Sequence, residues 1–159
     1  MATSTDLFDE LLAAVRRHFH DADPGSTFEL GDFLHAYGRA SDALLYAALF
    51  CPPLLEIDGS ILLRGAVEND ADRQRFLNCK TTKGRTEAER SFNFVEVPYL
   101  FGGQGRRLPD DDDRTLAQVI ASSWRAWLHA RFPGRKFAVE LLEPQETGSV
   151  VGIQFFELV

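Results

Sequence analysis

The sequence predicts an α+β domain with a mostly antiparallel sheet of about five strands and helices packed on one face. Three observations favour this class: each half of the chain contains an amphipathic helical segment, a two-residue hairpin signal occurs at Asp58-Gly59, and apolar segments typical of strands follow residue 136. Strands and helices do not alternate regularly, which argues against a parallel sheet. The 159 residues suit a single domain over residues 1–159, mainly helical over 1–50 and with a sheet and a long helix over 54–159.

Three helices are expected in the first fifty residues. Residues 6–19 place Leu7, Leu11 and Val15 on one face at helical spacing, and the early acids suit the positive end of that helix. Residues 28–37 are expected to contain a short helix, and residues 43–50 a clearer one. The Pro52-Pro53 pair must end that helix, because proline lacks the amide hydrogen and clashes with the preceding turn.

The middle of the chain is expected to form a hairpin, a short helix and a loop. Residues 54–63 have the pattern strand, turn, strand, since a type I′ turn requires positive φ at both central positions and Asp58-Gly59 tolerates it. Residues 66–77 are predicted as a short helix. Residues 78–91, NCKTTKGRTEAERS, lack large apolar side chains and are predicted as an exposed loop.

The last third is expected to supply the rest of the sheet and the long helix. Residues 92–97 are predicted as a strand that Pro98 ends or confines to an edge. Residues 115–132 form the second strong amphipathic helix. Residues 137–142 and 150–158 are expected to pair as a hairpin. The last strand is apolar on both faces and is therefore predicted at the centre of the sheet.

The negative charge of the chain is concentrated in its first part. The net charge is −7, and residues 1–60 hold ten acids against three bases, whereas the remaining 99 residues carry fourteen of each sign. Such asymmetry predicts a face for a cationic partner, although an acidic surface that only keeps the protein soluble is the plainer alternative. The acids expected to steer a partner are Asp6, Asp9, Glu10, Asp21, Asp23 and Asp32.

The stretch GGQGRRLPDDDDR, residues 102–114, combines glycines, arginines and aspartates, but it matches no known site pattern. It lacks the lysine of a phosphate-binding loop, the third glycine of a dinucleotide-binding loop and the alternating ligands of a calcium loop. We expect it to be a glycine-containing loop that leads into the long helix, with the aspartates as caps and dipole partners. An alternative ligand pocket would use Tyr99, Arg106, Arg107 and Trp127.

Other residue clusters point to no particular chemistry. His18, His20, Asp21 and Asp23 contain metal-ligand types, but imidazoles two positions apart at a helix end do not converge, so no metal or other cofactor is predicted. Cys79 lies near Lys80 and Lys83, which favours a thiolate, yet no base is identified for it.

The composition and the charge also bear on partners and location. Residues 73–90 carry a small positive excess, but the whole chain is acidic with a pI near 5.0, so nucleic acid is not an expected partner. No apolar run is long enough for a membrane span, and the first residues do not form a secretory signal; we therefore expect a cytoplasmic protein.

Three segments together resemble a group of small bacterial α+β proteins, some of which are encoded beside toxins as immunity proteins. The segments are FCPPLLEIDG at residues 50–59, NFVEVPYLF at 93–101, and the Trp124-x-x-Trp-Leu helix end at residues 124–133 followed by FAVE at 137–140. The resemblance covers roughly residues 40–158 and carries no functional motif. It implies a binding role and no mechanism.

The sequence thus favours a domain without catalysis that binds another protein, immunity-like or regulatory, through its acidic N-terminal region. The alternative from a different class is a small-ligand-binding protein or enzyme. A homodimer through a sheet edge or a helix face is a third interpretation.

Overall fold

The computed structural model describes residues 6–19, 27–101, 109–148 and 150–158. Within these ranges the chain forms seven α-helices: α1 (Leu7–His18), α2 (Leu30–Tyr37), α3 (Ala40–Phe50), α4 (Asp70–Lys83), α5 (Arg85–Phe92), α6 (Asp110–Arg131) and α7 (Pro144–Thr147). The strands and 3₁₀ helices of the same ranges are β1 (Leu54–Ile57), β2 (Ser60–Leu63), η1 (Arg64–Ala66), β3 (Val95–Glu96), η2 (Val97–Leu100), β4 (Phe137–Leu142) and β5 (Gly152–Glu157).

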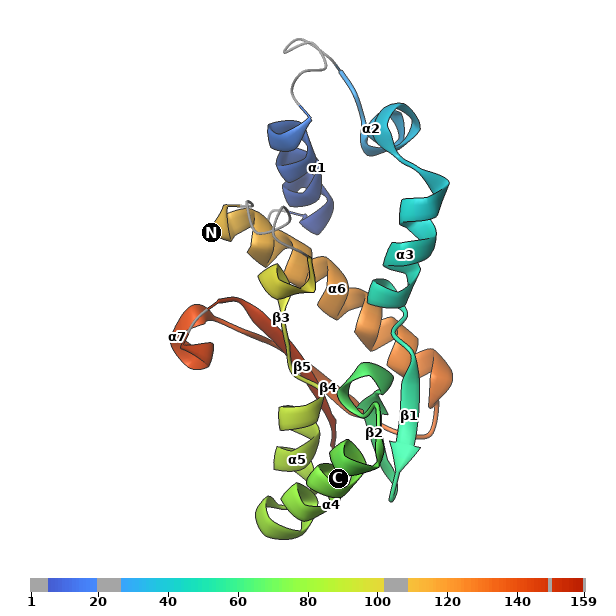
Figure 1. Ribbon diagram of the computed structural model, residues 1–159. Helices are drawn as coiled ribbons and strands as arrows, with labels where there is room; N and C mark the ends of the chain where they lie inside the picture. Colours follow the sequence, from blue (N-terminus) through green and yellow to red (C-terminus); the bar gives the residue numbers. More distant parts are fainter. Residues whose placement is uncertain (1–5, 20–26, 102–108, 149, 159) are drawn as a thin grey trace.

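The five strands form two separate antiparallel sheets, β1-β2 and β3-β5-β4 (Figure 1). The α+β class is therefore confirmed, but the expectation of one five-stranded sheet was wrong. The reason lies at Asn93, which is fully buried between β2 and β5. Its side-chain amide hydrogen-bonds to the backbone of both strands, so side-chain bonds take the place of a backbone ladder there.

Strand β5 occupies the centre of its sheet, as the sequence predicted, and it is covered on both faces. Ile153 and Phe155 pack into the main core with Trp124 of α6. The alternate residues Gln154 and Phe156 point to the opposite face, where the guanidinium of Arg90 from α5 lies 4.0 Å from the ring centre of Phe156. Helices thus contact both faces of this sheet, and the expected packing on one face was wrong.

The predicted hairpin is confirmed. Strands β1 and β2 pair antiparallel around a two-residue turn in which Asp58 has φ 49° and Gly59 φ 80°. Both φ values are positive, as a type I′ turn requires.

Residues 78–91, predicted as an exposed loop, are helical: they belong to α4 and α5, which meet at Gly84. Phe76, Ala88 and Phe92 from this helix pair are buried against the hairpin in a second, smaller core. The prediction failed because these few buried side chains are widely spaced, so they produce no apolar periodicity within residues 78–91.

Residues 92–97 were predicted as a strand, but only Val95 and Glu96 pair with β5. Phe92 instead ends α5, because the backbone turns at Asn93, whose side chain then reaches both sheets. The hairpin of β4 and β5 formed as expected, with the short helix α7 in its connection.

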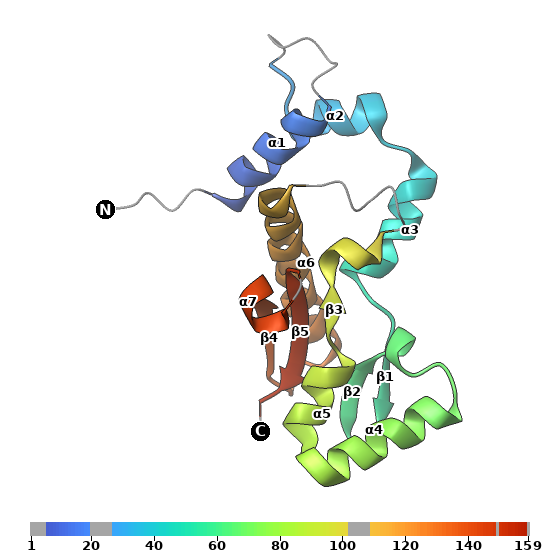
Figure 2. The same cartoon turned by 60° about the vertical axis from the view of Figure 1, so that its left-hand side comes forward.

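The first three helices form an N-terminal arm, α1–α3, beside the long helix α6. Figures 1 and 2 show α1 next to the first turns of α6, α2 extending away from it, and α3 returning towards the middle of α6. No helix in the described ranges is both long and apolar enough to cross a membrane.

Candidate protein-binding surface

Helix α3 is rich in apolar residues, yet none of its side chains is fully buried in the protein. Leu49 and Phe50, at its C-terminal end, pack against the main core. Leu44 and Leu45 are directed to solvent, with 79% and 70% of their surfaces exposed. Leu34 on the neighbouring helix α2 is 71% exposed. We call Leu34, Leu44 and Leu45 the arm face.

The C-terminal end of α3 and the segment that follows it are attached to α6 by three hydrogen bonds. The hydroxyl of Ser123 donates to the carbonyl oxygen of Phe50 at 2.7 Å, and the indole N–H of Trp124 donates to that of Leu49 at 2.8 Å. The Trp127 indole donates to the carbonyl of Pro52 at 3.1 Å. The last carbonyls of a helix lack partners within the helix, and Ser123 and Trp124 satisfy two of them. These bonds hold the end of α3, the helix that carries Leu44 and Leu45, against α6.

Helix α2 is attached to α1 through an aromatic cluster of Phe19, Phe28, Phe33 and Tyr37, whose ring centres lie 5.0–6.4 Å apart. Phe33 is the buried member of this cluster, and Arg16 donates a hydrogen bond to the carbonyl of Phe28 at 2.9 Å. These contacts account for the aromatic side chains of α2 and leave Leu34 on the outside.

A buried carboxylate holds the C-terminal end of α1 against the start of α6. Asp112, only 3% exposed, accepts hydrogen bonds from the Arg17 guanidinium and pairs with Nε2 of His18 at 2.6 Å. The bond from Arg17, assisted by His18, holds the pKa of Asp112 below its ordinary value.

Helix α6 begins at Asp110, earlier than predicted, and its N-cap Pro109 gives no side-chain cap. The aspartates expected as caps thus lie inside the first turn.

The acids predicted to meet a partner belong to more than one helix. Asp6 caps α1, and Asp6 and Glu10 line an open cavity of about 800 Å³ beside α6, whereas Asp9 is exposed. Asp32 lies in the first turn of α2 and accepts a hydrogen bond from the Glu29 backbone. These acids therefore lie at the starts of two different helices. Asp21 and Asp23 lie outside the described residues.

The structure describes only two of the four residues predicted for the alternative ligand pocket. Tyr99 is about half exposed on η2, and the polar atom of the Trp127 indole is engaged with the Pro52 carbonyl. Arg106 and Arg107 lie outside the described residues, as do His20 and the neighbouring aspartates of the proposed metal alternative. In the described ranges no group of three or more His, Cys, Asp or Glu side chains is arranged to hold a metal ion. The two cysteines, Cys51 and Cys79, are free thiols.

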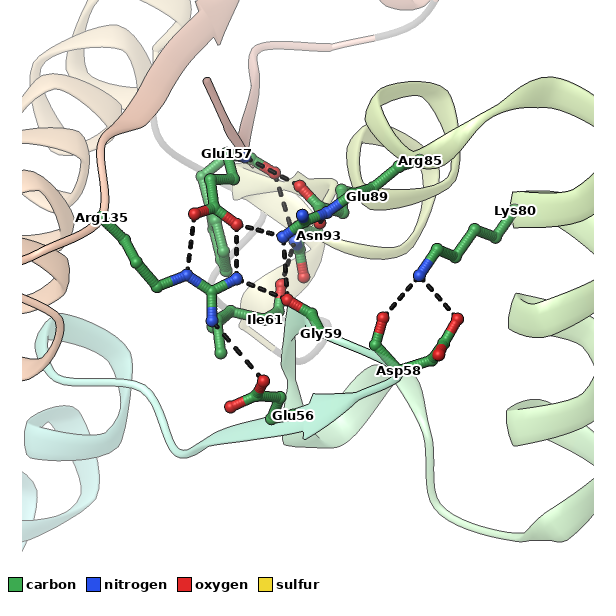
Figure 3. A network of polar contacts seen from close by, with 11 residues as sticks. Glu56, Asp58, Gly59, Ile61, Lys80, Arg85, Glu89, Asn93, Arg135 and Glu157 are labelled. Atoms are coloured by element: carbon green, nitrogen blue, oxygen red, sulfur yellow. Dashed lines mark hydrogen bonds and ion pairs between the residues drawn. The ribbon is translucent and has the colours of Figure 1, made fainter. Parts of the chain in front are cut away.

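A network of ion pairs joins the hairpin, α5, β5 and the turn after α6 (Figure 3). Arg85 and Arg135 both bind the carboxylate of Glu157, and Arg135 also donates to the carbonyl of Gly59 at 2.5 Å. The bond from Arg135 lowers the pKa of Glu157. Glu89, 1% exposed, accepts from Arg85 and from the backbone N–H of Glu157, at 2.7 and 2.8 Å. Because its donors and acceptors bind one another, this network serves to join elements of the fold.

The sequence alone does not predict the arm face, for a physical reason. The run ALLYAALF over residues 43–50 is apolar on all sides, which is typical of a buried helix. Sequence periodicity does not reveal whether the covering surface belongs to the same chain.

No family model matches this sequence, and no curated protein or solved structure is similar to it at a significant level.

Proposed function

We propose that this protein is a protein-binding domain whose arm face docks a basic, amphipathic segment of another protein. One observation carries the proposal: Leu44, Leu45 and Leu34 are all at least 70% exposed, although α3 is attached to α6 and α2 is attached to α1. Burying such a side chain is worth about 1.5–3 kcal/mol, so a partner that covers all three gains substantially.

The charge around the arm face supports a basic partner. Helix α2 has Glu29 at its N-cap and Asp32 in its first turn, and α3 has Asp42 in its first turn. One arginine, Arg39 at the N-cap of α3, is set against these three acids. In the sequence, residues 1–60 as a whole hold ten acids against three bases. Electrostatic attraction of this kind accelerates encounter and weakens with salt. The resemblance to immunity proteins agrees with such a role and remains a prediction. That the protein acts without catalysis, and that it is located in the cytoplasm, also remain predictions.

The test uses a short helical peptide of leucine and lysine, with a leucine–glutamate peptide of the same pattern as its charge control. Backbone NMR shifts of the labelled protein report where each peptide binds. We expect the lysine peptide to shift residues of α2 and α3, less strongly at high salt, and the glutamate peptide to bind much more weakly. Binding elsewhere, no binding, or equal binding of the two peptides would overturn the proposal.

Variants separate apolar from ionic contributions. The double variant Leu44→Asp/Leu45→Asp is expected to abolish peptide binding, and Glu29→Lys/Asp32→Lys to slow association. Glu68→Lys/Asp70→Lys, which alters two exposed acids near the start of α4, is the matched control and is expected to leave binding unchanged. Light scattering of the free protein completes the test, because a dimer that buries the arm face would mean that a second copy is the occupant.

A further inference from the structure

A second candidate site lies where the end of α6 meets the start of β4. It is a cavity of about 370 Å³, within the range that holds small organic ligands. We call it the cationic pocket, and its lining residues are Arg125, Leu128, His129, Arg135, Lys136, Phe137 and Leu158.

Among the residues that the structure describes, the lining contains four basic side chains and no acidic one, in a chain whose net charge is −7. The cavities beside Arg75 and Arg90, by contrast, both include carboxylates. Arg135 is paired with Glu157 and Glu56, which are not part of the lining. Within the described residues, Arg125, His129 and Lys136 form no ion pair with a carboxylate. Three basic groups thus line one cavity, and none of them pairs with a carboxylate of the described part of the chain.

Backbone contacts position these groups. One Nη of Arg125 donates to the carbonyl oxygen of Val139 on β4 at 2.8 Å, which leaves further guanidinium N–H groups for a ligand. The backbone N–H of Leu158 donates to the carbonyl of Lys136 at 2.8 Å, so these two lining residues are held beside each other. Histidine near a helix C-terminus is favoured by the helix dipole. That explanation accounts for His129 but not for Arg125, which precedes the last turn, or for Lys136, which lies beyond the helix.

The floor of the pocket is apolar. Leu128 is buried, and the ring of Phe137 packs against those of Phe132 and Phe155 with centres 5.8 and 6.2 Å away. Guanidinium and ammonium groups bind carboxylate and phosphate oxygens through charge-assisted hydrogen bonds. The geometry points to a small organic anion as the ligand: a carboxylate or phosphate attached to an aromatic or aliphatic body that covers this floor.

The pocket is independent of the arm face. Arg125 and His129 are one turn apart on α6, on the side turned away from Ser123 and Trp127, which hold α3. A failure of one proposal therefore leaves the other to be judged by its own test.

The experiment measures binding of phenyl phosphate, benzoate, inorganic phosphate and the neutral benzamide by NMR titration. We expect saturable binding of phenyl phosphate, benzoate or both, with shifts confined to residues 125–137 and 158, and much weaker binding of inorganic phosphate and benzamide. Equal binding of inorganic phosphate would show that the apolar floor contributes nothing. Equal binding of benzamide would show that charge contributes nothing. Either result, or no saturable binding, overturns the proposal.

Lys136→Gln removes one exposed charge and is expected to weaken binding about tenfold, which is typical of losing one charge-assisted contact. Lys83→Gln, at an exposed lysine of α4, is the matched control and should bind as the wild type does. If Lys136→Gln and His129→Gln both bind the aromatic anion as tightly as the wild type does, the ligand binds elsewhere. Thermal unfolding of each variant verifies that a loss of binding is not a loss of the fold.

Discussion

The side-chain amide of Asn93 donates a hydrogen bond to the backbone carbonyl of Phe155 at 3.2 Å, and thereby connects the β1–β2 hairpin to the three-stranded sheet. The same side chain donates to Ile61 at 3.0 Å and accepts from the N–H of Leu63 at 2.9 Å. All three bonds are buried. The two sheets therefore share one residue that satisfies backbone groups of both.

Asn93→Ala is expected to lower the free energy of unfolding by about 2–4 kcal/mol, because it leaves buried backbone groups of both sheets without partners. Urea unfolding monitored by tryptophan fluorescence measures the change. The matched control Asn78→Ala removes an exposed amide on α4 and is expected to cost less than about 0.5 kcal/mol. Similar losses in the two variants would contradict the role assigned to Asn93.

Asp112→Asn is expected to lower the unfolding free energy by about 1–2 kcal/mol at neutral pH, a value reduced because Arg17 is half exposed. The pKa of Asp112 is lower in the folded protein than in the unfolded chain, so its contribution is present at neutral pH and is lost as the pH falls through the folded pKa. The gap between wild type and variant should therefore shrink as the pH falls below about 4, the ordinary pKa of an aspartate. A gap that stays constant with pH would refute this explanation. Asp111→Asn, one residue earlier and exposed, is the control.

Ser123→Ala is expected to weaken the attachment of α3, because the Phe50 carbonyl loses its side-chain donor. Ser122→Ala, at the adjacent exposed residue, changes helix propensity equally without removing a hydrogen bond of the described structure. We expect Ser123→Ala to be about 1 kcal/mol less stable than Ser122→Ala. Hydrogen exchange should also be faster at Cys51, the C-cap of α3, in the first variant. Equal stability and equal exchange would show that the bond contributes nothing.

Gly59→Ala is expected to cost about 1–2 kcal/mol, because Gly59 has φ 80° and a side chain there disfavours this left-handed conformation. Gly65→Ala is the control: Gly65 is not among the residues with positive φ, and an added Cβ would meet nothing within 4 Å. Chemical denaturation of the two variants gives the comparison. If Gly65→Ala were as destabilising as Gly59→Ala, the turn conformation would not be the cause.

The features that the sequence predicted correctly are those that depend on neighbours along the chain. Asp58-Gly59 specifies a tight turn through its own backbone preferences. The spacing of Leu7, Leu11 and Val15 marks a helix by itself, and the apolar residues of β5 on both faces indicate a central strand. The excess of acids in residues 1–60 is likewise a property of the sequence alone, and it supports the choice of a basic partner.

The predictions that failed depend on residues far apart in the sequence. A helix pair with few large apolar residues, α4–α5, is stabilised by the hairpin it covers, and its own sequence resembles a polar loop. Neither candidate site was predictable, because each combines residues from separate elements. Leu34 and Leu44 come from two helices, and Arg125 and Lys136 meet only where α6 and β4 adjoin.

The sequence by itself therefore determined the α+β class, the hairpin turn, the two amphipathic helices and the acidic N-terminal region, since local backbone preferences and periodicity decide these features. Only the tertiary structure decided that the sheet is divided in two at Asn93, that Asp112 is buried under α1, and that α3 presents its leucines to solvent. The reason is that burial and hydrogen-bond partners are set by which distant segments pack together, and that information is not present in any single stretch of the chain.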